Sequence, residues 1–219
     1  QENEYVLIGV LGKMSAIEPL PANFSVVPAQ PNDFTLGGFF DLHRILKTRR
    51  CDLLHVPHLF WKPQLLPCPY VVTVHDLLDH LYRLYSTSTF LRSLHYQFTK
   101  RVLHHASRIF AVSNFSKKDT ERIFHVPAEK IEVIYNAIDD RFRAGHASEV
   151  DRQFIAERYQ VNYPFLLYAG RISPHKNIPR IIEAFAALKA ELLKEEVYED
   201  LKLIIIGDEV SKHPDLRRA

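Results

Sequence analysis

The sequence predicts an α/β fold in which parallel strands form doubly wound sheets covered by helices. Short apolar runs alternate with longer segments of helical periodicity, which is typical of βαβ units. Most of these runs are apolar at consecutive positions, as expected for parallel strands that are buried on both faces. A polar passage, "NAIDDRFRAGHAS" at residues 136–148, separates two such stretches. We therefore expect two domains, residues 1–140 and 141–219.

The individual elements follow from the same patterns. Apolar runs that predict strands cover residues 5–10, 25–27, 52–56, 70–74, 108–112, 131–135, 165–169 and 201–206. Helical periodicity covers residues 37–49, 80–105, 114–125, 149–159 and 178–198. The last helix has the clearest pattern, because Ile178, Ile181 and Phe185 fall on one apolar stripe.

Composition narrows the function classes. The 28 Lys and Arg residues nearly balance the 26 Asp and Glu residues, so a nucleic-acid surface is not expected. Cys51 and Cys68 have no metal or redox spacing, and two thiols in 219 residues fit a reducing cytoplasm. The chain lacks both an apolar run near the ~18 residues of a membrane span and a signal peptide. We expect a cytoplasmic protein whose natural start is not Gln1.

Polar residues follow nearly every predicted strand. Ligands in open α/β sheets bind beyond the carboxyl ends of the strands, so these residues are the first candidates for a site. They are His55, Pro57, His58, His75, Asp76, Ser113, Asn114, Asn136, Gly170, Arg171, Gly207 and Asp208.

The segment "LYAGRISPHKNIPRII", residues 167–182, places two cations where a strand passes into a helix. Gly170 allows a tight turn. Arg171 offers a planar fork for two phosphate oxygens, and Lys176 offers a compact charge. Asn177 is expected to cap the following helix, whose positive end favours anions. These groups predict an anion site; the alternative is that both cations are merely solvated.

The segment "VVTVHDLLDH", residues 71–80, offers another kind of site. His75 and Asp76 stand at a strand end, and Asp79 and His80 follow one helical turn later. This spacing is compatible with a metal, which would indicate a metal-dependent phosphohydrolase. A cleft histidine also serves as a proton carrier or as the partner of a hydroxyl. The remaining alternative is that His75 only hydrogen-bonds its own loop.

The segment "YAGRISPHKNIPRIIEAFAAL", residues 168–188, resembles the donor-phosphate segment of the retaining glycosyltransferases of family 4, which have the GT-B fold. In that family a G-R-x-x-x-x-K-N run follows the first strand of the C-terminal domain. Four further segments resemble the family in its own order. They are "VVTVHDLLDHLY", "SRIFAVSNFSKKDTERIF", "IEVIYNAIDDRF" and "LKLIIIGDEVSKHPDLRRA".

The resemblance implies a GT-B architecture. Residues 1–140 would form the N-terminal, acceptor-side Rossmann-like domain, and residues 141–219 the start of the C-terminal, nucleotide-sugar-binding domain. Arg171 and Lys176 would hold the diphosphate and stabilise its growing charge. His75 would lie beside the sugar ring. The donor-binding residues would be Gly170, Arg171, Lys176, Asn177, Ser113 and Gly207.

The resemblance also implies the chemistry. The sugar of GDP-mannose or a UDP-sugar would pass with retention to a glycan or lipid-linked acceptor, as in polysaccharide biosynthesis, without metal or cofactor. Nothing before Tyr5 supplies the glycine-rich loop of the family, and the chain stops at Ala219, before its E-x7-E segment. We expect a piece of a longer hexosyltransferase that is inactive alone. The alternative is an α/β binding module without catalysis.

The segment from residue 80 to residue 105 is basic and amphipathic, with no acidic residue after Asp79. This combination of cations and apolar residues is typical of a segment that lies on the surface of an anionic membrane. We expect a peripheral contact at the inner face of the membrane. The alternative is that the apolar stripe packs on the sheet.

Overall fold

The computed structural model describes residues 3–9, 20–28, 36–59, 66–82, 88–142, 148–192 and 198–207. The chain divides into two compact units, Gln1–Ala137 (unit 1) and Ile138–Ala219 (unit 2). Every strand pair in the described residues is parallel, and helices lie on the connections from β4 to β5, from β5 to β6 and from β7 to β8. The predicted α/β class is therefore confirmed.

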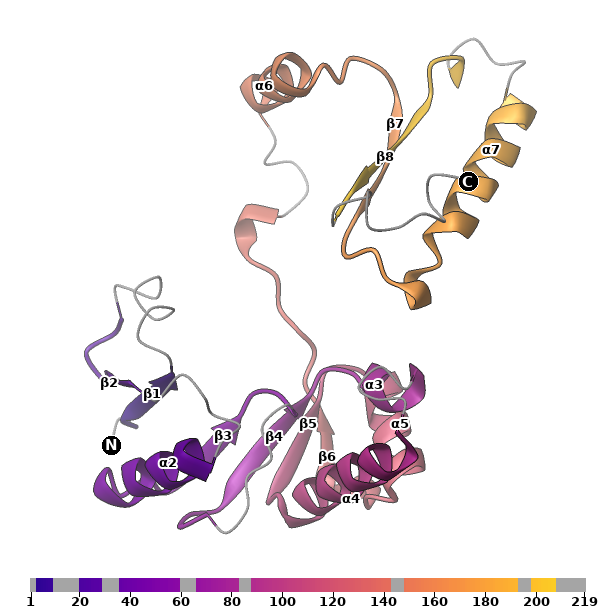
Figure 1. The fold of residues 1–219 in the computed structure, drawn as a ribbon. Helices are drawn as coiled ribbons and strands as arrows, with labels where there is room; N and C mark the ends of the chain where they lie inside the picture. Colours follow the sequence, from indigo (N-terminus) through magenta and orange to yellow (C-terminus); the bar gives the residue numbers. More distant parts are fainter. Residues whose placement is uncertain are drawn as a thin grey trace. The chain divides into compact units, whose positions relative to one another are not determined.

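Unit 1 holds two parallel sheets. Its elements are β1 (Tyr5–Gly9), β2 (Phe24–Pro28), α2 (Leu36–Thr48), β3 (Leu54–Val56), β4 (Tyr70–Val74), α3 (Leu78–Tyr82), α4 (Thr89–His105), β5 (Arg108–Ala111), α5 (Asn114–Phe124), η2 (Ala128–Lys130) and β6 (Ile131–Val133). Strands β1 and β2 pair with each other, and the second sheet has the order β3-β4-β5-β6 (Figure 1).

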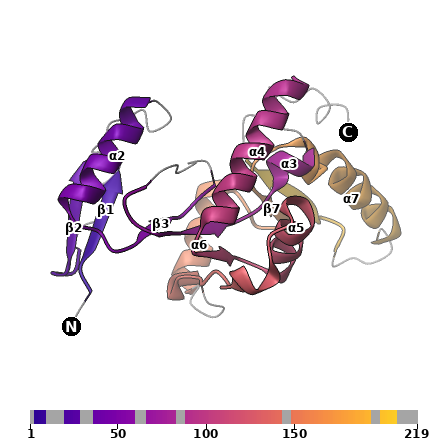
Figure 2. The same ribbon diagram turned by 90° about the horizontal axis from the view of Figure 1, so that it is seen from below.

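Helices α4 and α5 lie beside one another against the four-stranded sheet (Figures 1 and 2). They connect β4 to β5 and β5 to β6, and right-handed crossovers between strands in sequential order place both helices on one face. Tyr96 Oη on α4 donates to the Ile123 carbonyl on α5 at 3.0 Å. Tyr70 Oη on β4 donates to the Val102 carbonyl on α4 at 2.8 Å, which ties the helix to the sheet.

One hydrophobic core lies between this sheet and its helices. Its side chains come from β3, β4, β5, β6, α4 and α5, so each element contributes to the burial of the others. Val72, Val74, Leu103, Ile109 and Phe124 are fully buried. The strand predictions at 70–74 and 108–112 thus correspond to the two central strands of this sheet, each of which contributes fully buried side chains to the core.

Unit 2 contains η3 (Asp140–Phe142), α6 (Glu149–Tyr159), β7 (Phe165–Ala169), η4 (Pro174–Lys176), α7 (Ile178–Leu192) and β8 (Lys202–Ile206). Strands β7 and β8 pair in register from Phe165 opposite Lys202 to Ala169 opposite Ile206. Helix α6 begins with a capping box in which Ser148 and Asp151 bind each other's backbone N–H.

Two helix predictions were wrong in extent. The segment predicted as one helix at 80–105 forms α3 and α4, which are separate helices; residues 83–87 lie outside the described residues. A second N-cap starts α4, because the Ser88 side chain accepts a bond from the Leu91 N–H. For the helix predicted at 178–198, α7 is described as far as Leu192, and residues 193–197 lie outside the described residues. Tyr198 instead lies in a turn that the Leu201 N–H closes by donating to the Tyr198 carbonyl at 3.0 Å.

Several helices end in a left-handed residue that is not glycine. His125 caps α5 with φ 55°, and Gln160 caps α6 with φ 56°. Arg50, after α2, and Asn177, after η4, also have positive φ. At α5 the His125 N–H donates to the Glu121 carbonyl, so the left-handed turn satisfies a helix-end acceptor.

Candidate functional site

His75, the histidine predicted to contact a sugar, directly follows β4. Its Nε2 lies 3.0 Å from the Pro57 carbonyl, and its ring stacks on that of His58 with centroids 5.5 Å apart and planes 22° apart. Pro57 and His58 follow β3, the neighbouring strand. His75 therefore bonds to an adjacent strand end rather than to its own loop.

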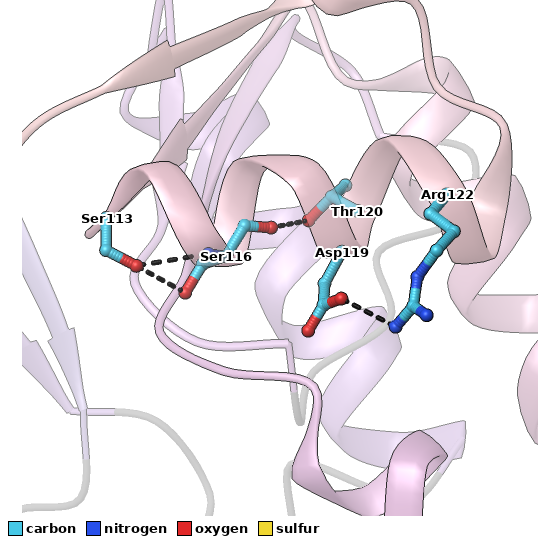
Figure 3. A network of polar contacts seen from close by, with 5 residues as sticks. All are labelled: Ser113, Ser116, Asp119, Thr120 and Arg122. Carbon is cyan, nitrogen blue, oxygen red and sulfur yellow. Dashed lines mark hydrogen bonds and ion pairs between the residues drawn. The ribbon is translucent and has the colours of Figure 1, made fainter.

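Ser113 follows β5 and caps α5. Its Oγ accepts a bond from the Ser116 N–H at 3.0 Å and donates to Ser116 Oγ at 3.1 Å (Figure 3). Ser116 Oγ in turn donates to the His75 carbonyl at 3.0 Å. The structure thus joins Ser113 and His75, which the sequence selected separately, through a residue that the sequence analysis missed.

The buried face of α5 is polar from Ser116 to Thr120, before Phe124 enters the core. Thr120 Oγ1 donates to the Ser116 carbonyl at 2.7 Å, and Arg122 pairs with Asp119 at 2.8 Å (Figure 3). Ser116, Asp119 and Thr120 are all less than one tenth exposed. A search for apolar periodicity cannot find such a face; the Ser-x-x-Ser spacing at the helix start was the available signal.

The proposed metal ligands of residues 75–80 serve separate purposes. The Asp76 carboxylate accepts from the Leu78 N–H at 3.0 Å, at the start of α3. The His80 ring stacks on His95 at 4.6 Å and meets the edge of the Phe124 ring at 4.9 Å. Among the described residues no group of three or more His, Cys, Asp or Glu could hold a metal ion. The phosphohydrolase alternative is therefore not favoured.

His55 is a further histidine of the sheet edge. Its Nε2 lies 2.8 Å from Thr73 Oγ1 on the neighbouring strand β4. Partial burial lowers the pKa of His55, which favours the neutral ring near pH 7. This bond links the side chains of two neighbouring strands, His55 on β3 and Thr73 on β4.

In unit 2, Gly170 and Gly207 end the paired strands β7 and β8. The Gly170 N–H donates to the Ile206 carbonyl at 2.9 Å. A Cβ at position 207 would lie 2.3 Å from the Gly170 carbonyl oxygen, closer than any real contact. The two backbones thus touch where both strands end, and position 207 has no room for a side chain.

Arg171 and Lys176 are exposed on the connection from β7 to α7. Tyr168 Oη donates to the Arg171 carbonyl at 3.1 Å and so holds the first residue of this connection. Lys176 is the last residue of η4, and Asn177 alone separates it from the first residue of α7. Both predicted cations therefore follow the strand end and precede the helix, as the sequence indicated.

Asn177 directly precedes α7, the position at which the sequence predicted an N-cap, but its backbone differs from that of most N-cap residues. Asn177 has φ 51° and ψ 46°, which is left-handed, whereas N-cap residues are extended. Its N–H donates to the Pro174 carbonyl at 3.1 Å, and its carbonyl accepts from the Arg180 N–H at 3.1 Å. Asn fits because its short polar side chain tolerates this region. The N–H groups of Asn177 and Arg180 are used here, so an anion would depend on the cationic side chains.

A hollow of about 470 Å³ lies beside this loop. Its lining is mainly apolar, from Leu166 and Leu203 of the sheet and from one face of α7, with Lys176 and Arg180 at the polar part. An apolar hollow is the wrong chemistry for a diphosphate. Arg180, which the sequence analysis did not consider, pairs with Glu183 at 3.3 Å.

Comparison with known proteins places the chain in a family. The model of Glycosyltransferase Family 4 matches residues 15–142, more than half of the chain. The chain belongs to this family. The model of Glycosyl transferases group 1 matches residues 150–217 in addition.

One curated protein and several solved structures are also similar to this chain. The serotype-specific mannosyltransferase WbdA of Escherichia coli is 29% identical over 87 residues, which are 40% of this chain but only 11% of WbdA. Anabaena Alr3699/HepE in complex with UDP-glucose matches with 15% identity and a TM-score of 0.60, over 98% of this chain and 71% of that one. WaaG, a glycosyltransferase involved in lipopolysaccharide biosynthesis, matches with 15% identity and a TM-score of 0.60, over 99% and 66%. These structures support the predicted GT-B fold.

Proposed function

We propose that the protein carrying this chain is a glycosyltransferase that moves a hexose from a nucleotide-diphosphate sugar to a glycan or lipid-linked acceptor. The observation that carries the proposal is the loop after β7, where Arg171 and Lys176 are both exposed, in a chain of glycosyltransferase family 4. Two flexible cations at a strand end suit a diphosphate. They would stabilise the charge that grows on it as the sugar leaves.

The donor remains within two classes. HepE was crystallised with UDP-glucose, and WbdA is a mannosyltransferase, so a UDP-sugar and GDP-mannose are the donors that we propose to test. We propose retention of the anomeric configuration and transfer without a metal. NMR of the first product would give the anomer, and transfer that survives EDTA would agree with metal independence. Inactivation by EDTA that only added metal reverses would contradict it.

Calorimetry with GDP and UDP tests the diphosphate site in the 219-residue chain. Arg171→Ala should weaken binding by at least about tenfold, since charge-assisted hydrogen bonds contribute about 1.5–3 kcal/mol each. Arg180→Ala is the matched control, because it removes a nearby exposed cation that already pairs with Glu183. An equal loss in both variants would mean that only the net charge matters. Unchanged affinity in Arg171→Ala would sink the site.

Sugar-transfer assays of the full-length protein then distinguish an enzyme from a binding module. A transferase should lose sugar transfer by orders of magnitude in Arg171→Ala. A binding module without catalysis would bind the nucleotide and show no transfer with any donor, even in the unsubstituted protein.

We also propose a peripheral membrane contact through α4. In the C-terminal half of this helix Val102 and Leu103 are buried in the core. Nearer its N-terminus, between residues 90 and 98, Phe90 is 74% exposed, and Leu91, Leu94 and Phe98 are between 41% and 51% exposed. The helix carries Arg92, Lys100 and Arg101 and no acidic residue. The predicted packing on the sheet thus accounts for only half of the apolar stripe.

Cosedimentation with vesicles tests this contact. No helix in the described part of the chain is long and apolar enough to cross a bilayer, so binding would be at the surface. Binding should need anionic lipid and fade as salt screens the charges. Phe90→Ser should weaken it, whereas Phe154→Ser, which changes a 60% exposed phenylalanine of α6, should not. If equal amounts of protein cosediment with neutral and anionic vesicles, the exposed apolar residues of α4 do not bind an anionic membrane.

A further inference from the structure

We propose that Pro57, His58 and Ser116 are positioning residues that hold His75 in one orientation and in one tautomer. The proposed tautomer carries its proton on Nε2 and leaves Nδ1 as the hydrogen-bond acceptor of the ring. The three residues come from two elements other than that of His75, namely the end of β3 and the first turn of α5. The inference rests on the proposed function only for the identity of the group that Nδ1 would bind.

The tautomer follows from the chemistry of the partner. The His75 Nε2 lies 3.0 Å from the Pro57 carbonyl oxygen, and a carbonyl can only accept. Nε2 must therefore carry a proton for this bond to form. In the neutral ring Nδ1 then holds a lone pair and has no proton to donate.

The orientation of the ring is limited by His58. The two rings are nearly parallel, with planes 22° apart and centroids 5.5 Å apart, in the range of offset stacking. The hydrogen bond to Pro57 defines one edge of the His75 ring, and the stack defines its plane. A ring flip would break the bond and place Nδ1 on another side.

The backbone of His75 is held from α5. Ser116 Oγ donates to the His75 carbonyl at 3.0 Å, and Ser113 Oγ donates to Ser116 Oγ at 3.1 Å. Ser116 is 7% exposed, so its hydroxyl has few alternative partners in solvent. Both the side chain and the main chain of His75 are therefore fixed by neighbouring elements.

This arrangement assigns a polarity to the site. A neutral histidine that presents Nδ1 accepts a hydrogen bond from a hydroxyl, whereas it gives nothing to a phosphate oxygen. If the proposed function holds, the partner of His75 is a sugar hydroxyl and not the diphosphate. The diphosphate would then depend on the cations Arg171 and Lys176.

NMR of the histidine ring nitrogens in the 219-residue chain, at about pH 8.5 where imidazole is ordinarily neutral, tests the inference. His75 should show a protonated Nε2 whose proton exchanges slowly enough to be observed, and an unprotonated Nδ1. His105 is an internal reference for the opposite tautomer, because its Nδ1 lies 2.8 Å from the Arg101 carbonyl. A proton on Nδ1 of His75 would overturn the proposal.

Variants separate positioning from general stability. His58→Ala should speed exchange of the His75 ring proton about tenfold, the loss expected for one weakened hydrogen bond. His58→Phe should restore slow exchange, because it keeps an aromatic ring. Ser116→Ala should also speed exchange, and Ser116→Thr should restore it. Thr120→Val is the matched control, since Thr120 is fully buried on the same helix and its Oγ1 donates to the Ser116 carbonyl rather than to His75. Equal exchange in His58→Ala and Thr120→Val would refute the role of His58.

No donor is present in this experiment. A proton on Nδ1 of His75 would therefore not contradict the transferase proposal. Conversely, the NMR result can be interpreted even if the protein proves not to be a transferase.

Discussion

Strands β4 and β7 have similar apolar compositions but very different surroundings. Val72 and Val74 of β4 are fully buried, whereas Leu167 of β7 is 55% exposed. Strand β4 pairs with β3 on one side and β5 on the other, and α4 bonds to it. Strand β7 pairs only with β8 among the described residues. An apolar run thus predicts a strand, but neighbouring strands and helices decide whether it forms a core.

The same difference separates the candidate residues of unit 1 from those of unit 2. In unit 1, His75 and Ser113 take part in hydrogen bonds that also hold β4 and α5 together. In unit 2, Arg171 and Lys176 are exposed. Substitutions at the first pair should therefore change structure and chemistry together, whereas substitutions at the cations should change ligand binding alone.

The largest expected loss of stability comes from a substitution in the core of unit 1. Phe124 is fully buried and its ring stacks on Tyr96 at 5.2 Å, so Phe124→Ala should destabilise unit 1 by about 3–5 kcal/mol. Leu167→Ala removes a side chain that is already half exposed and should cost less than about 1 kcal/mol. Hydrogen exchange of the β4 and β7 amides measures each unit separately. Equal losses would mean that β7 is as well packed as β4.

A second change addresses what holds unit 2 together. Gly207→Ala would force a Cβ against the Gly170 carbonyl, and we expect a cost of about 1–3 kcal/mol from the backbone shift. The Gly170 amide, which donates to the Ile206 carbonyl, should lose protection from exchange. Unchanged protection would show that the strand ends separate freely, and that their contact contributes little.

The smallest of the three effects concerns the tie between β4 and α4. Tyr70→Phe removes the bond to the Val102 carbonyl, which keeps its bond from the Ala106 N–H, so a cost of about 0.5–1.5 kcal/mol is expected. Burial raises the pKa of Tyr70 to about 12, while Arg101 opposes the shift.

The raised pKa gives this tie a pH dependence. Its contribution to the free energy of unfolding should be fully present below pH 10 and lost as pH rises toward about 12. Denaturant unfolding between these pH values measures the loss in the natural chain. The same decline in Tyr70→Phe would assign it to other groups.

Much of the fold could be predicted because apolar periodicity reports burial directly. The strands at 70–74 and 165–169 and the helix at 149–159 have the predicted bounds. The helix predicted at 80–105 was too long, because periodicity does not register a break that a second cap at Ser88 introduces. Periodicity also cannot predict which of two apolar strands finds neighbours.

The candidate site shows the same limit. Placement after strands pointed to His75 in unit 1 and to Arg171 in unit 2, since parallel topology puts the carboxyl ends of the strands of each sheet at one edge of that sheet. Ser116 was missed because it is a buried polar residue inside a helix, and its partner lies 41 residues away. Asn177 was selected correctly as a helix-start residue, but its left-handed backbone depends on the turn before it.

The left-handed caps at His125 and Gln160 show that this chain has unused capacity for stabilisation. The chain contains only seven glycines in 219 residues, and a left-handed backbone costs about 1–2 kcal/mol for a residue with a Cβ. Glycine there would remove that strain but add freedom to the unfolded chain, a penalty of about 0.5–1 kcal/mol. The net gain in Gln160→Gly should lie between about 0 and 1.5 kcal/mol, reduced by loss of the bond from Gln160 Nε2 to the Glu157 carbonyl, and should appear as at most a small rise in Tm. These two helix ends are therefore positions at which the stability of the protein can be changed without altering His75 or Arg171.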